Sequence, residues 1–241
     1  MARGDRDAHS AWRVCRIEFL GSSVEWRSTL FIFGKRAPLL PRARRSFHEL
    51  RPRVTLPFMY GLVNKAVEGL VRSKFGDDAW DKVRVKAGIP DEPFISMENY
   101  DDAVTYDLVG AACSVLNLSP EIVLEEFGKY WVLYTGEAGY GALMQGAGDT
   151  LPVFVKNLDA MHTRVKLSYP NLQPPSFRVT NESANAFTLH YHTHRAGLAP
   201  FVVGLLKGLA SRFNVNMEIA YTRVEGEAPH DSFVIRWEPI S

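Results

Sequence analysis

Hydrophobic residues recur every three or four positions through the first half of the chain, which is the period of an amphipathic helix. The spacing predicts helices over 59–76, 77–87 and 103–118, with Gly76 as a C-cap. The pair Ser119-Pro120 then supplies the N-cap and the first position of another helix. We expect this half to contain five to seven helices and no strands.

The stretch 149–165 places a histidine among the apolar positions of such a helix. The predicted inward face consists of Leu151, Phe154, Val155, Leu158, His162 and Val165. An imidazole that points into an apolar interior needs a hydrogen-bond partner, a buried charge or a metal ion. On its own this pattern favours an ordinary core histidine with a hydrogen-bond partner, and a metal ligand is the alternative.

After residue 165 the hydrophobic period changes from helical to alternating. Strands are predicted over 177–182, 186–195, 215–224 and 232–238, with one helix over 200–213. Local hairpins of this kind indicate a four-stranded antiparallel sheet. The predicted class is therefore α+β, with a helical part over 59–166 and a sheet part over 175–241 that carries one inserted helix.

Alternation along the second predicted strand separates its side chains into two rows. One row consists of Phe187, Leu189, Tyr191, Thr193 and Arg195. The other row consists of His190, His192 and His194. A phenol, a hydroxyl and a guanidinium in line suit a ligand with two carboxylates, because arginine binds a carboxylate through two N–H groups. The alternatives are a solvated arginine at a strand end and, for the histidines, a solvated face or a transition-metal site.

Charge is distributed unevenly along a chain of ordinary globular composition. The 241 residues are 46% hydrophobic and 23% charged, with a formal net charge of +1. Residues 1–58 carry 12 Lys or Arg against 5 Asp or Glu, whereas 59–241 carry 16 against 22. The acidic body argues against nucleic-acid binding. We interpret 1–58 as a basic extension that is disordered or lies upstream of the true start, with Met59 as an alternative initiator.

Cysteine content and hydropathy favour a cytoplasmic protein. Only Cys15 and Cys113 are present, too few for a disulfide framework or a cysteine zinc site, and two free thiols fit a reducing compartment. No run reaches the roughly 18 apolar residues of a membrane-spanning helix. We therefore predict no membrane span.

An inward histidine, a row of anion-binding donors and an aromatic, apolar lining together suit haem, whose iron takes an axial imidazole. The motifs also resemble a known family, the haem nitric oxide/oxygen-binding (H-NOX) domains, which are related to the haem domain of soluble guanylate cyclase. The resemblance rests on Met-Tyr-Gly-Leu-Val-Asn-Lys from Met59, on Met161-His162, on Pro174-Pro175 and on Tyr191-x-Thr193-x-Arg195. Thr193 replaces the serine of the family signature, and 1–58 has no counterpart in it.

The resemblance implies haem b (iron protoporphyrin IX) with His162 as the ligand of a five-coordinate ferrous iron. Tyr191, Thr193 and Arg195 would bind the propionates, and Pro175 would press on the macrocycle. The residues implied as pocket lining are Val63, Leu158, Trp131, Phe201 and Leu205. Oxygen-binding members carry a tyrosine on the helix after the signature strand, but 198–205 has none.

The function implied is a gas sensor and not an enzyme. It would bind NO and CO, exclude O2 and signal by release of the proximal histidine to a separate protein, a histidine kinase or a cyclic-di-nucleotide enzyme. Two alternatives stay open: a carrier or binding module for haem or another flat apolar ligand, and a haem peroxidase-like enzyme.

Overall fold

The computed structural model describes residues 58–240, so Cys15 and the predicted extension, apart from Phe58, lie outside the described residues. Within 58–240 no single helix is long and apolar enough to cross a membrane. The only helices in this range that pass such a test do so as a pair bent by 114° (Asp102–Leu116 with Pro120–Gly136).

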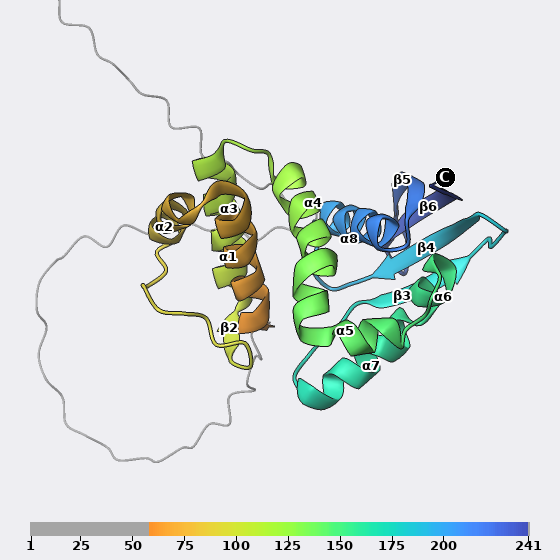
Figure 1. The fold of residues 1–241 in the computed structure, drawn as a ribbon, viewed down its shortest axis with the longest axis horizontal. Helices are drawn as coiled ribbons and strands as arrows, with labels where there is room; N and C mark the ends of the chain where they lie inside the picture. Colours follow the sequence, from red (N-terminus) through yellow and green to blue (C-terminus); the bar gives the residue numbers. More distant parts are fainter. Residues whose placement is uncertain (1–57, 241) are drawn as a thin grey trace, which may run out of the picture. The chain divides into compact units, whose positions relative to one another are not determined.

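The first half of the described chain is helical, as predicted (Figure 1). Its helices are α1 (Gly61–Phe75), α2 (Asp77–Lys86), α3 (Asp102–Leu116), α4 (Pro120–Tyr130), the π-helical turn η1 (Trp131–Gly136), α5 (Glu137–Gln145), α6 (Leu151–Lys156) and α7 (Leu158–Ser168). Gly76 follows α1 with a φ of 84°, a conformation that favours glycine. The Ser119 hydroxyl accepts a hydrogen bond from the Ile122 amide at the start of α4. Both predicted helix boundaries are confirmed.

Two short strands in this half were not predicted. β1 (Phe58–Tyr60) pairs antiparallel with β2 (Asn99–Asp101), and Phe58 lies opposite Asp101. Three-residue strands carry too few alternating positions to be recognised in a sequence. The pairing also brings Phe58 into the fold, although this residue was expected to be the last of the extension.

The second half contains the predicted four-stranded antiparallel sheet, so the α+β class is confirmed. Its elements are β3 (Ser176–Thr180), β4 (Ala186–His192), α8 (Ala199–Arg212), β5 (Val215–Val224) and β6 (His230–Pro239). The spatial order is β3-β4-β6-β5, which places β6 between the strand before α8 and the strand after it. In this register Leu189 of β4 lies opposite Phe233 of β6.

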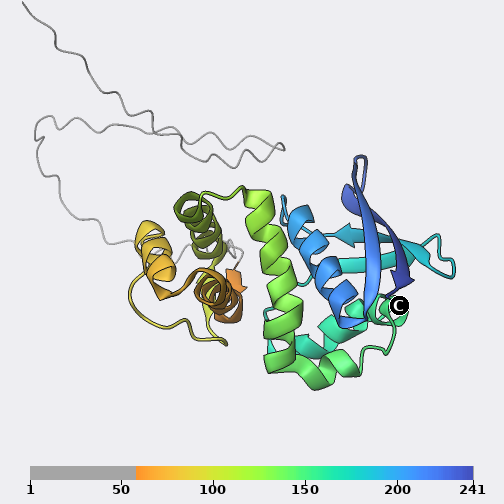
Figure 2. The ribbon, with the colours of Figure 1, turned by 45° about the horizontal axis from the view of Figure 1, so that its top comes forward.

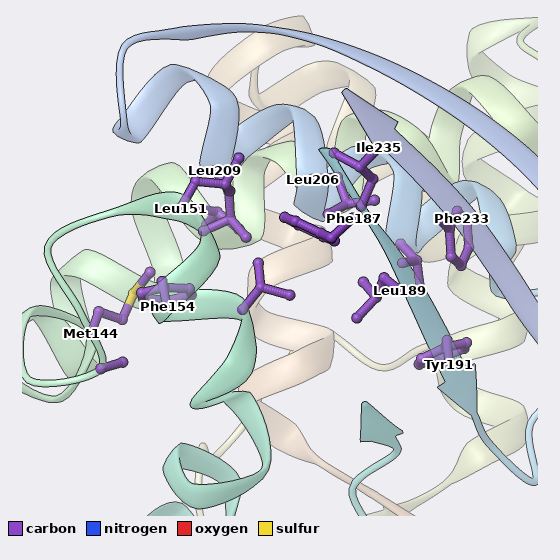
Figure 3. Close-up of a cluster of buried hydrophobic side chains, with 14 of the residues drawn as sticks. Met144, Leu151, Phe154, Phe187, Leu189, Tyr191, Leu206, Leu209, Phe233 and Ile235 are labelled. Atoms are coloured by element: carbon purple, nitrogen blue, oxygen red, sulfur yellow. The ribbon is translucent and has the colours of Figure 1, made fainter. Parts of the chain in front are cut away.

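One face of this sheet packs against α8 to form an apolar core. Figure 3 shows Phe187, Leu189 and Tyr191 following one another along β4, on the side of Leu206. Phe233 and Ile235 of β6 are fully buried in the same core. The alternation predicted for β4 is therefore confirmed up to Tyr191.

The helical half and the sheet half meet where α4 and α8 lie side by side (Figures 1 and 2). A Cβ on Gly128 would collide with the carbonyl oxygen of Phe201, and a Cβ on Gly204 with that of Glu125. Glycine at these two positions lets the backbones approach closely.

Three predictions about individual elements were wrong. The helix expected over 149–165 is broken at Asn157, whose side-chain amide donates to the Ala147 carbonyl at 2.8 Å. The strand expected over 186–195 ends at His192, and the chain bends after it. The spacing of Val123, Phe127, Trp131 and Tyr134 in the sequence predicts one buried helix face. Tyr134 is instead 59% exposed, because the π-helical turn changes the angle between successive side chains.

Candidate functional site

His162 lies on α7 with a buried ring nitrogen. Its Nδ1 atom is shielded from solvent and has no hydrogen-bond partner among the described residues. Its ring stacks on Phe177 of β3 with 5.7 Å between the ring centroids. Burial lowers the pKa of His162, although the nearby Asp159 carboxylate acts in the opposite direction. The ring is therefore neutral near pH 7, as a metal ligand must be.

Tyr191 and Thr193 form a hydrogen-bonded pair at the end of β4. Tyr191 is buried, and burial raises the pKa of its phenol to about 12 although the Thr193 hydroxyl acts in the opposite direction. The Thr193 hydroxyl also accepts a hydrogen bond from the Arg195 amide at 3.1 Å. The bend after His192 thus keeps the three signature side chains together, although only Tyr191 lies on the strand.

Arg195 binds the carboxylate of Asp102, a partner that the sequence did not indicate. Its Nε and Nη2 atoms donate to the two oxygens of Asp102, the first residue of α3, at 2.9 and 3.3 Å. The side chains are only 12% and 7% exposed. Arg195 also donates to the carbonyls of Phe58 and Gln173 at 3.3 and 3.4 Å. It therefore connects β1, α3 and the segment before β3, and its planar fork is shown in the bidentate geometry that binds carboxylates.

The predicted lining residues border two different cores. Val63, Trp131 and Phe201 pack against the core of α1 to α4. Leu158 and Leu205 pack against the core between the sheet and α8. All five are half-buried, as is Pro175 one residue before β3.

Aromatic rings connect the parts of the site. Phe127 lies 6.1 Å from Trp131 and 5.1 Å from Phe201 between ring centroids, so these rings form one group at the junction of α4 and α8. Phe177 lies 5.7 Å from the His162 ring and 5.4 Å from that of Tyr191. Phe177 thus connects the predicted iron ligand to the predicted propionate site.

Three contributors to the site were missed in the sequence. Asp102 is 93 residues from Arg195, and nothing local marks it as its partner. Asp159 accepts from the Phe177 amide at 2.8 Å and from the Ser176 hydroxyl at 3.2 Å, which fastens α7 to β3. Phe177 was placed correctly on a strand, but only its contact with His162 gives it a role.

One enclosed apolar cavity lies elsewhere, among α1, α3 and α4. It measures about 30 Å³, and its lining includes Val67, Leu70, Val109, Val123 and Phe127. None of the sequence-predicted haem residues lines it. It contributes nothing to the assignment of the site.

The residue types at this site match the groups that a haem requires. Haem needs a neutral imidazole, flat apolar walls and partners for two carboxylates. The unpartnered Nδ1 of the neutral His162 ring, the half-buried apolar residues and the signature side chains Tyr191, Thr193 and Arg195 supply each of these.

The Haem-NO-binding family model matches residues 60–221. The chain belongs to the Haem-NO-binding family. Among its relatives are the soluble guanylate cyclases gcy-32 and gcy-34 of Caenorhabditis elegans, 31% identical over 157 residues and 30% identical over 165 residues, or 64% and 67% of this chain. It covers only 23% and 24% of those proteins, so it spans about a quarter of their length.

Solved H-NOX structures share the fold. The unliganded Fe(II) H-NOX protein of K. algicida is 22% identical with a TM-score of 0.65, and the alignment covers 76% of this chain and 98% of that one. The H-NOX protein of S. oneidensis in the Fe(II)NO ligation state is 22% identical with a TM-score of 0.66, covering 75% and 99%. The resemblance to H-NOX domains, which are haem-binding sensor domains, is thereby confirmed.

Proposed function

We propose that this chain is a haem-based sensor that binds NO and CO at a five-coordinate ferrous haem b, excludes O2 and signals to a separate protein. The observation that carries the proposal is the buried, unpartnered ring nitrogen of His162. The His162 ring stacks on the Phe177 ring, which in turn contacts the ring of Tyr191 in the signature. Family membership supports the haem-binding part of the proposal.

Each residue of the site has a role that follows from its chemistry. Bound haem supplies the iron at which the gas binds. His162 would hold that iron, and the hydroxyls of Tyr191 and Thr193 would donate to propionate oxygens. Arg195, which donates to the carbonyls of Phe58 and Gln173, would neutralise the propionate charge. Pro175, in the segment before β3, would press on the macrocycle.

Selectivity against O2 follows from the chemistry of α8. Bound O2 is polar and is stabilised by a hydrogen-bond donor, whereas NO binds ferrous iron strongly without one. Residues 198–205 offer only apolar side chains, including Phe201 and Leu205. The one side-chain donor among the five predicted lining residues is the indole N–H of Trp131, which lies on η1 and packs against the core of α1 to α4. Because α8 itself offers bound O2 no donor, we expect no stable O2 complex.

The signal begins at α7. If NO binding released His162 from the iron, the Asp159 carboxylate would still join α7 to β3, because it accepts hydrogen bonds from the Phe177 amide and the Ser176 hydroxyl. A movement of α7 would then be passed to the sheet, and a partner would bind the two arrangements with different affinity. A histidine kinase or a cyclic-di-nucleotide enzyme is the proposed partner. The cyclase activity of the longer relatives is not proposed for this chain.

Absorption spectra of the reduced protein test the proposal. The full chain is expressed with added haem precursor, reduced, and exposed separately to NO, CO and air. We expect the Soret band to shift with NO and with CO but to stay unchanged in air before slow oxidation. A stable oxy spectrum would contradict O2 exclusion, peroxide turnover would support the enzyme instead, and a colourless protein would leave only a binding module for another ligand.

A further inference from the structure

Three histidines lie together on the outer side of the sheet. His190 and His192 alternate with the inward residues Leu189 and Tyr191 on β4. The ring of His230, at the start of β6, lies 5.1 Å from the ring of His190 and 4.5 Å from that of His192. Among residues 58–240 no group of three or more His, Cys, Asp or Glu side chains is arranged to hold a metal ion. The contacts between these rings bear on how the cluster binds protons.

The hydrogen bonds fix where the protons of the neutral pair must be. The Nδ1 of His230 lies 2.9 Å from the Ala228 carbonyl, which can only accept, so Nδ1 carries the proton and Nε2 is an acceptor. His190 Nδ1 lies 3.0 Å from that Nε2 and must therefore donate to it. His190 Nε2 is then left to accept from the Thr180 hydroxyl at 2.8 Å. Both neutral rings are Nδ1–H tautomers in a chain that runs from Thr180 to Ala228.

This chain of hydrogen bonds can accept one added proton but not a second. A proton on His230 Nε2 can donate to His190 Nδ1 if the His190 proton moves to Nε2, where Thr180 accepts it. The chain is then reversed between Thr180 and His230, and every partner is still satisfied. With two protons, the N–H groups of two cations would face each other across 3.0 Å, where no acceptor remains.

We infer that His190 and His230 form a coupled pair that holds one proton but not two, and that the second proton separates the start of β6 from β4. The pair consists of residues of the sheet alone, so this inference goes beyond the proposed function and does not depend on haem. It affects the strand that carries the haem signature, because Tyr191 lies between His190 and His192 and pairs with Asp231 in the adjacent register position.

The residues around the His190–His230 pair disfavour a second positive charge on it. β3 contributes Arg178, which lies opposite His190, and β5 contributes the uncharged Val224 opposite His230. Burial, the His230 ring, Arg178 and His192 all lower the pKa of His190. The carboxylate that acts in the opposite direction, Asp159 of α7, affects His192.

Nitrogen NMR of the histidine rings tests the inference directly, because ring 15N shifts distinguish the tautomers and the cation. The full chain is labelled with 15N, kept in a metal chelator and titrated from about pH 8 to about pH 5. At high pH both rings should show Nδ1–H. On acidification His190 should move to Nε2–H while His230 becomes cationic, and a second step should follow at least one pH unit lower.

Two variants separate the coupled pair from two independent histidines. His190→Gln removes the coupling, so the two-step pattern should disappear. His194→Gln, at an exposed position beyond the same strand, should leave both steps unchanged. Amide protection factors at the start of β6, which are corrected for the pH dependence of intrinsic exchange, should also fall by up to tenfold per pH unit below the second step in the wild type, and not in His190→Gln.

Some results would overturn the inference. They are an Nε2–H tautomer of either ring at high pH, or two rings that titrate together in one ordinary step. If His190→Gln does not fold, the tautomers and steps of the wild type still decide between these outcomes. Unchanged amide protection factors at the start of β6 below the second step would overturn the proposed separation of the strands.

Discussion

Replacing Asp102 with asparagine tests whether Arg195 serves the cofactor. Asp102 and Arg195 form a bidentate ion pair at 2.9 and 3.3 Å, with side chains 7% and 12% exposed. In protein prepared without haem, no propionate can take the place of Asp102 beside the guanidinium. Removing one partner of a buried ion pair costs about 3 to 5 kcal/mol, because the other charge is left uncompensated. Arg195 retains some solvent and two carbonyl partners, so we expect the lower end, about 3 kcal/mol.

In the haem-loaded protein, Asp102→Asn should reduce the free energy of unfolding by less. A propionate beside the guanidinium supplies the missing negative charge, which leaves a loss comparable to one hydrogen bond, about 1 kcal/mol. The difference of about 2 kcal/mol between the two forms means that the variant binds haem roughly 30-fold more tightly than the wild type does. The sign of this change is unusual, since most substitutions near a cofactor weaken its binding.

Urea unfolding of the haem-free and haem-loaded forms measures both losses. Asp101→Asn is the matched control. Asp101 is the exposed neighbour that caps α3 through the Ala103 amide, and asparagine caps helices equally well, so both forms should keep their stability. Equal losses in the two forms of Asp102→Asn would refute the reasoning, because they would mean that no propionate reaches Arg195.

Four further substitutions, one of them the control Gly110→Ala, test individual contacts. Gly128→Ala should destabilise the protein by about 1 to 3 kcal/mol in thermal unfolding because its Cβ meets the Phe201 backbone, whereas Gly110→Ala, with open space around it in α3, should stabilise it by about 0.5 to 1 kcal/mol. Equal effects would contradict the close contact of α4 and α8. The pKa of Tyr191 is raised to about 12, so the folded protein favours the protonated phenol. This preference contributes fully to the free energy of unfolding below about pH 10, and the contribution is lost as the pH rises towards 12. Tyr191→Phe should abolish up to about 2.7 kcal/mol of this alkaline loss in unfolding titrations, and an unchanged pH profile would contradict the burial of the phenol. Asp159→Asn should weaken the attachment of α7 to β3 by about 1 kcal/mol and speed amide exchange over 158–168, while unaltered exchange there would argue against that attachment.

The features of the fold that depend on local pattern could be predicted from the sequence. The period of the apolar residues predicted α1 and its end at Gly76, and alternation predicted Phe187, Leu189 and Tyr191 on one buried row. Each of these depends on contacts within one element or between neighbours in the chain. The break at Asn157 did not follow from the pattern, because it is fixed by a hydrogen bond to Ala147, ten residues earlier.

The sequence singled out candidate residues for the site, but it did not indicate which residues they contact. His162 and Arg195 could be singled out because their types are unusual at inward positions. Their partners could not, since Phe177 reaches His162 and Asp102 reaches Arg195 only after the helical and sheet halves have packed. The partner of His190 in the hydrogen-bond chain was likewise not predictable from the sequence. His190 and His192 were expected on one face, but His230 joins them from a strand 40 residues away from His190.

Replacing His162 with glycine tests the central claim most directly, because it removes the ring that is proposed to hold the iron and leaves space for free imidazole. The variant, purified with haem supplied, should lack the ferrous Soret band of the wild type when imidazole is absent, and should regain that band and its shift with NO when imidazole is added. A variant whose ferrous spectrum matches the wild type without imidazole would show that another group holds the iron.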